Sequence, residues 1–303
     1  MPRDLSDVFH YFLPELADET EADTAPSRLK PQSPQAAPPQ PLPSAKTERR
    51  AETPETPPPA APVTSSEPGT LPLPILGLPI GDRDVVRAAL AWNLAIETAR
   101  LGGASIILSP ESDAGSPLWP APGTGPLGTE LHFSSARSIE ELVHEASLLS
   151  TARAQIPQRG GIVFVRIPPA WLEKQDGLER GAMDAIRWML LLSSANQGDL
   201  DEAADLAARM LRANPSAEIG LTIHGVQAID EARQAFEYLS RVSEEKLALV
   251  LISYGLLVDD LHVYRAIAAQ RPIGLAHPQA PATRALMDVA RLLYEDARSR
   301  VLG

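Results

Sequence analysis

The side chains that could do chemistry in this chain of 303 residues are six histidines and scattered acids, with no cysteine. A histidine beside a carboxylate can act as a general acid or base, and histidines and acids at short, regular spacing can bind a metal ion. Neither spacing occurs around the five histidines of the main apolar region, which are His132, His144, His224, His262 and His277. We therefore expect no catalytic residue and no metal site, and we interpret the histidines as surface or core residues.

The elements that would position a site are clearest after Leu71, where short apolar runs alternate with amphipathic stretches. The runs are apolar on both faces, which is typical of strands covered by helices on both sides. Strands alternating with helices indicate an α/β fold, with a mainly parallel sheet and helices on both of its faces. We predict strands over residues 73–78, 105–108, 161–167, 186–193, 218–223 and 246–252, and helices over residues 85–101, 139–149, 199–212, 228–241 and 283–298.

Two stretches of this pattern are specific enough to indicate a family. The first is ALAWNLA at residues 89–95 with ARLGG at residues 99–103, and the second begins with DEARQAFE at residues 230–237. Together with the order of the elements, they resemble the MinD/ParA-type P-loop ATPases, most closely the flagellar-number regulator branch called FlhG. The resemblance covers residues 73–293, and it implies a P-loop NTPase-like fold in a family that binds ATP and Mg2+.

The nucleotide-binding loop of that family, GKGGxGKT, falls on GDRDVVRA at residues 81–88. Such a loop works because its glycines let backbone N–H groups surround phosphate, a lysine neutralises charge and the threonine holds Mg2+. Gly81 keeps the first glycine, and Arg87 keeps a positive charge at the lysine. Asp82 stands at the family's signature lysine and Ala88 at the threonine. The loop is therefore degenerate.

Three further nucleotide positions depart in the same direction. Arg166 replaces the family's Mg2+-linked aspartate, and His224 stands where an asparagine contacts adenine. Glu111 or Asp113 is the only acid near the family's second aspartate motif. These departures predict a pseudo-ATPase that binds neither ATP nor Mg2+.

The family resemblance together with the degenerate nucleotide positions predicts a non-catalytic MinD/ParA-like scaffold or adaptor. Such a protein would bind protein partners in cell polarity, motility or partitioning. The alternative is a residual nucleotide-binding switch of the same family, which would use Arg87 and Glu111 to regulate a partner in flagellar or polar placement. A membrane-surface protein is a third interpretation. It is disfavoured because residues 293–303 are short and mixed in charge, whereas an interfacial helix needs a large apolar face.

The N-terminal region predicts a separate contact with a partner. Residues 1–19 carry an apolar cluster at helical spacing, and residues 20–70 are rich in proline and poor in large apolar side chains, which indicates a disordered linker before a domain over residues 71–303. We predict that the cluster docks on a protein partner, and a frayed end or a segment folded back on the domain is the alternative. Its candidate contact residues are Leu5, Val8, Phe9, Tyr11, Phe12 and Leu13.

The net charge and the lack of targeting signals disfavour a nucleic-acid-binding, secreted or membrane-spanning protein. The formal net charge of -12 disfavours nucleic-acid binding, because lysine and arginine supply most of the affinity for phosphate. The acidic start lacks the basic and apolar regions of a signal peptide, and no apolar run reaches the ~20 residues of a membrane helix. We expect a cytoplasmic protein without stable membrane binding, and a homodimer stays open.

Overall fold

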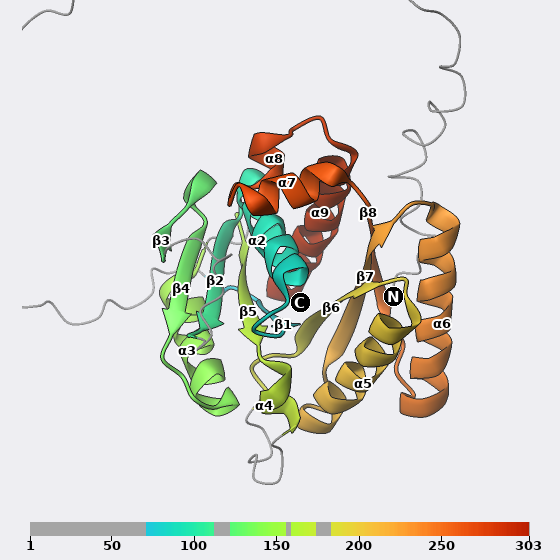
Figure 1. Ribbon diagram of the computed structural model, residues 1–303. Helices are drawn as coiled ribbons and strands as arrows, with labels where there is room; N and C mark the ends of the chain where they lie inside the picture. The colour runs from blue at the N-terminus through green and yellow to red at the C-terminus, as the bar shows by residue number, and fades with distance from the viewer. Residues whose placement is uncertain (1–70, 112–121, 156–158, 174–182, 303) are drawn as a thin grey trace, which may run out of the picture.

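The computed structural model describes residues 71–111, 122–155, 159–173 and 183–302. A single eight-stranded sheet runs through these residues in the order β3-β4-β2-β5-β1-β6-β7-β8, and helices lie on both of its sides (Figure 1). All pairs are parallel except β3 with β4. The strands are β1 (Ile75–Pro79), β2 (Ala104–Pro110), β3 (Gly123–Thr124), β4 (Glu130–Ser134), β5 (Gly161–Ile167), β6 (Trp188–Ser194), β7 (Glu218–Val226) and β8 (Ile252–Val258).

The helices form two layers. Helices α2 and α9 pack on each other and on β2, β5 and β8, whereas α3, α5 and α6 connect strands across the other face. The parallel order requires these crossovers, and each strand in the middle of the sheet is covered on both sides. The helices are α2 (Val85–Arg100), α3 (Ile139–Ala152), α4 (Pro169–Glu173), α5 (Gln197–Ala213), α6 (Ile229–Leu247), α7 (Leu261–Ala268), α8 (Ile273–Ala276) and α9 (Pro281–Leu302), with a 3-10 turn at Pro126–Gly128.

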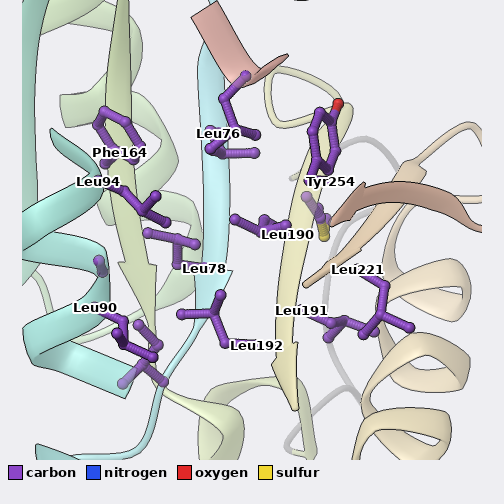
Figure 2. Close-up of a cluster of buried hydrophobic side chains, with 14 of the residues drawn as sticks. Leu76, Leu78, Leu90, Leu94, Phe164, Leu190, Leu191, Leu192, Leu221 and Tyr254 are labelled. Carbon is purple, nitrogen blue, oxygen red and sulfur yellow. The ribbon is translucent and has the colours of Figure 1, made fainter. Parts of the chain in front are cut away.

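Strand β1 lies at the centre of the sheet and carries the main core. Leu76 of β1 is level with Phe164 of β5 on one side and with Trp188 of β6 on the other. Figure 2 shows Leu90 and Leu94 projecting from α2 toward the sheet, and all five of these side chains are buried. Each such residue contributes about 1.5 to 3 kcal/mol by leaving water, so this packing fixes where β1 ends and α2 begins.

The carboxyl end of the chain is tied to the sheet by a buried polar chain. The indole N–H of Trp188 donates a hydrogen bond to the hydroxyl of Tyr254 at 2.9 Å, and that hydroxyl donates to Asp296 of α9 at 2.7 Å. Tyr254 occupies the space above Gly220, where a Cβ would lie 2.2 Å from the tyrosine ring. Glycine is required there because the ring packs directly on the backbone of β7.

The α/β fold predicted from the sequence is confirmed, with the first five strands and all five helices near their predicted positions. The last predicted strand, residues 246–252, is wrong. Helix α6 continues to Leu247 and ends at Ala248, whose φ of 51° is left-handed, and β8 begins only at Ile252. A short apolar run cannot distinguish a helix end and its connection from a strand. The pattern also missed β4, which has only five residues, three of them incompletely buried.

The predictions about residues 1–19 and 20–70 lie outside the described residues and stay predictions. The predicted start of the domain at residue 71 also stays a prediction. The first buried core residue that the structure describes is Leu73, which is 2% exposed.

Candidate functional site

In the loop between β1 and α2, two backbone N–H groups bond to the loop itself. The amides of Asp84 and Val85 donate to carbonyls within the loop, and the amide of Ala88 donates to the carbonyl of Asp84. The carboxylate of Asp84 accepts from the amide of Arg87 at 3.0 Å and caps the helix. The positive end of α2 therefore faces an anion that belongs to the chain itself.

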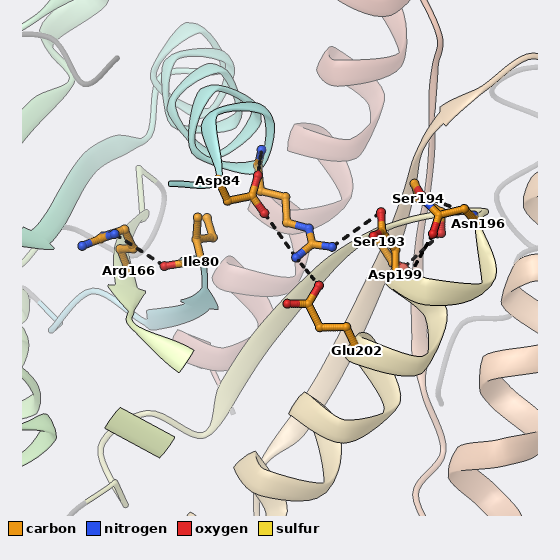
Figure 3. Close-up of polar contacts among 9 residues, drawn as sticks. Ile80, Asp84, Arg166, Ser193, Ser194, Asn196, Asp199 and Glu202 are labelled. Carbon is orange, nitrogen blue, oxygen red and sulfur yellow. Dashed lines mark hydrogen bonds and ion pairs between the residues drawn. The ribbon is translucent and has the colours of Figure 1, made fainter. Parts of the chain in front are cut away.

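Arg87 is 8% exposed and lies in the first turn of α2. Its guanidinium pairs with Glu202 at 2.8 Å, with Asp84 at 3.2 Å and with Asp199 at 3.7 Å. Figure 3 shows Asp84 at the start of α2, with Asp199 and Glu202 beside it on α5. Three carboxylates thus face one guanidinium, and the cluster has an excess of negative charge.

Arg166 forms a second internal ion pair at the same edge of the sheet. It is the penultimate residue of β5, its side chain is 3% exposed, and its guanidinium donates to Asp82 at 2.7 Å and to the hydroxyl of Ser109 at 3.0 Å. Longer hydrogen bonds of 3.5 and 3.4 Å reach the carbonyls of Ile80 and Pro110. Arg166 therefore joins the ends of β1, β2 and β5 to the loop before α2.

His224 lies near the carboxyl end of β7, facing the Arg87 cluster. Burial, followed by the charge of Arg87, lowers the pKa of His224 to about 4, against smaller opposing effects of Asp84 and Asp199. Its Nε2 atom is buried and has no hydrogen-bond partner among the described residues. The imidazole is therefore neutral at pH 7.

An open cleft of about 740 Å³ runs between the loop and α5. It lies at the carboxyl edge of the strands, beside β1 and β6, where the strand order reverses direction, and open α/β sheets bind ligands at this position. Its described lining is Gly81, Asp82, Arg83, Asp84, Val86, Arg87, Ser194, Asn196, Asp199, Glu202, His224, Gly225 and Tyr264.

The structure brings most of the sequence-predicted positions together at this edge. Gly81, Asp82, Arg87 and His224 line the cleft, and Arg166 lies beneath Asp82. Ala88 is buried in the core and offers no oxygen to a ligand. Glu111 is exposed after β2 and is not among the acids that pair with Arg87. Asp113 and the N-terminal contact residues lie outside the described residues.

Three important carboxylates were not identified from the sequence. Asp84 lies three residues before Arg87, which is the spacing of a helix cap, and that signal was available. Asp199 lies in the first turn of α5 and Glu202 in the second, and only the fold brings them to Arg87. Within the part of the chain that the structure describes, no three histidines or acids are grouped as a metal site, and no helix is long and apolar enough to cross a membrane.

No protein-family model matches the chain, and no curated protein matches its sequence. Solved structures do match. The chain is similar to the MinD cell division protein of Aquifex aeolicus, at 16% identity and a TM-score of 0.52 over 73% of this chain and 97% of that one. It is similar to that organism's MinC:MinD complex, at 15% identity and a TM-score of 0.52 over 73% and 96% of the two chains.

A third similar structure is the septum site-determining protein MinD of Pyrococcus horikoshii OT3, solved as a complex with Mg-ADP. It matches at 10% identity and a TM-score of 0.51 over 73% of this chain and 95% of that one. At these identities the likeness shows the fold alone. The described part of the chain thus has the fold of the MinD/ParA-type P-loop ATPases, as the sequence predicted.

Replacing Asp82 with asparagine should lower the free energy of unfolding by about 1 to 2 kcal/mol, because Arg166 stays buried and loses a charged partner. The loss is limited because Asp82 is itself 46% exposed. Urea unfolding would measure it. The matched control is Arg83→Gln, a charge removed from the exposed neighbouring residue, which should change stability by less than about 0.5 kcal/mol. Equal effects of the two substitutions would contradict the role of the Asp82–Arg166 pair.

His224 should make the protein less stable as the pH falls from 7.5 to 5. Its pKa is about 4 when folded, below the ordinary value of 6.5, so the unfolded chain takes up the proton first. The resulting loss is about 2 kcal/mol at pH 5. Urea unfolding of His224→Asn across this range should show a flatter profile, whereas His144→Asn, on the exposed face of α3, should follow the parent. An unchanged slope in His224→Asn would contradict the assignment.

Proposed function

We propose that the chain is a non-catalytic MinD/ParA-like adaptor, a pseudo-ATPase that binds protein partners. The observation that carries this proposal is that the chain's own carboxylates occupy the start of α2. The amides of Asp84 and Val85 donate within the loop, Asp84 occupies the positive helix end, and Arg87 is enclosed by three carboxylates. A phosphate there would have to displace Asp84 and compete for Arg87 with Asp199 and Glu202.

The residues present do not fit Mg2+ with a nucleotide. The buried Ala88 has no hydroxyl, and Arg166 carries positive charge at the position where the family's Mg2+-linked aspartate stands. Asp82 carries negative charge at the signature lysine, so the two substitutions exchange the signs of the family's charges. Arg166 and Asp82 pair with each other, which supports a structural role for both residues in place of nucleotide binding. We therefore derive no chemical step through a nucleotide.

Protein binding is the activity that remains for such a domain. One similar structure is a MinC:MinD complex, so MinD of Aquifex aeolicus uses this fold to hold another protein. We place this chain in the same general role, in polarity, motility or partitioning. The FlhG branch stays our preferred relative because of the sequence stretches that resemble it.

Mg-ATP at millimolar concentration should leave the melting temperature unchanged. A ligand present at 100 times its dissociation constant stabilises the folded state by about 2.7 kcal/mol, which thermal unfolding detects easily. The MinD of Pyrococcus horikoshii, solved with Mg-ADP, is the positive control for the assay. A rise of several degrees that requires Mg2+ would favour the alternative, a residual nucleotide switch, and the test of that switch is whether Glu111→Gln removes the rise.

The N-terminal segment is the second part of the proposal. Phe9 and Phe12 share one face of a short helical pattern, and such faces bind in hydrophobic grooves. The segment is too short to stay helical alone, so it would order on binding. Burial of each aromatic contributes on the order of 1.5 to 3 kcal/mol toward that ordering.

Replacing both Phe9 and Phe12 with alanine should therefore abolish capture of partners from the native cell, without changing the melting temperature. Pull-down followed by mass spectrometry measures the first and thermal unfolding the second. The matched control replaces two apolar residues of the linker, Leu29→Ala with Leu42→Ala, and should retain capture. If the Phe9 and Phe12 variant keeps its partners, or loses stability, the segment instead folds back on the domain.

A further inference from the structure

The cleft at the carboxyl edge of the sheet is electronegative. Asp82, Asp84, Asp199 and Glu202 line it, against the guanidinium groups of Arg83 and Arg87, and Arg166 beneath the cleft pairs with Asp82. Arg87 is buried and paired with Asp84, Asp199 and Glu202, so these three carboxylates outnumber the one guanidinium that they face. The α5 side of the cleft therefore favours cations over phosphates.

The acids of this cleft remain accessible from solvent. The side chain of Glu202 is 49% exposed and that of Asp199 is 34% exposed. Burial raises the pKa of Asp199, but hydrogen bonds from Ser194 and Asn196 and the charge of Arg87 together hold it below its ordinary value. The carboxylate of Asp199 is thus ionised at pH 7, and a carboxylate has lone pairs enough to accept further hydrogen bonds from a cationic group.

An apolar rim adjoins the acids. Tyr264 of α7 lines the cleft and is 49% exposed, and Leu261, one turn earlier on the same helix, is 60% exposed. Residues three apart on a helix share a face, so the two form one surface. Between rim and acids lies His224, a neutral imidazole whose buried Nε2 has no partner among the described residues. A small cation bound to the acids would not contact the apolar side chains of this rim.

We propose that this cleft binds a basic segment of a partner protein, with an arginine or lysine against Glu202 and Asp199 and an apolar side chain on Tyr264 and Leu261. The inference rests on the proposed function and adds the partner's chemistry and the surface that receives it. Charge complementarity selects the basic segment, and the exposed apolar pair selects a peptide over a metal ion or a polyamine. Nucleic acids and anionic lipid surfaces carry the wrong charge for these walls.

The test uses the full chain and a fluorescent peptide of alternating arginine and leucine, with fluorescence anisotropy at physiological salt as the measurement. We expect saturable binding that the double variant Glu202→Gln with Tyr264→Ala weakens at least tenfold. Glu202→Gln removes one of the three carboxylates from the buried Arg87, so the variant should melt a few degrees below the parent, as Asp82→Asn should, while Asp84 and Asp199 keep Arg87 paired and the protein folded at the assay temperature. A peptide of alternating glutamate and leucine should not bind.

The matched control is Glu244→Gln with Leu148→Ala, which removes one exposed acid and one exposed apolar side chain from the later turns of α6 and α3. It should bind the basic peptide within twofold of the parent. The inference is overturned if the control loses as much affinity as the cleft variant, since the peptide would then follow the overall charge of -12. It is also overturned if no saturable binding occurs, or if spermine competes as well as unlabelled peptide.

The two proposals fail in different assays. Stabilisation by Mg-ATP would contradict the proposal that the chain is a pseudo-ATPase, whatever the result of the peptide assay. Absence of peptide binding in a protein that Mg-ATP does not stabilise removes only the assignment of the cleft.

Discussion

A guanidinium buried at the carboxyl edge of a parallel sheet must find acceptors for its N–H groups, because an unpaired buried charge is among the most destabilising features a fold can contain. Arg166 meets this requirement with Asp82, the hydroxyl of Ser109 and two backbone carbonyls. These acceptors come from the ends of two strands, β1 and β2, and from the loop before α2. The side chain of Arg166 therefore fixes the relative positions of these strand ends. Through Asp82 it also fixes the position of the loop before α2.

The loop continues the same arrangement on its other side. Asp84 caps α2 and pairs with Arg87, and Arg87 extends to Asp199 and Glu202 on α5. The two arginines thus connect the loop to β5 on one side and to α5 on the other. In a phosphate-binding loop an external anion would supply much of this negative charge. Here Asp84, Asp199 and Glu202 of the chain itself supply it.

The fold could be predicted because its signals are local and redundant. Both-faced apolar runs and amphipathic stretches alternate over more than two hundred residues, so a mistake at one element, such as residues 246–252, does not alter the class. The positions of Arg87, Arg166 and His224 at one edge followed from the family pattern. The partners of Arg87 did not, because Asp199 and Glu202 lie more than a hundred residues away. Only the parallel sheet, which brings all strand ends to the same edge, joins them.

The crevice itself is a consequence of topology and not of any ligand. Strand β1 lies between β5 and β6, and the connections from β1 to β2 and from β5 to β6 run to opposite sides of it, so helices do not close the space above its carboxyl end. A sequence that changes the charges there keeps the hollow and changes only what it attracts. With acids from the loop and from α5 on its walls, and exposed Leu261 and Tyr264 at its rim, this hollow presents charge and apolar surface together. That pairing is the feature by which a cleft distinguishes a polypeptide from a simple ion, and it is why our proposal gives this edge of the sheet a protein partner.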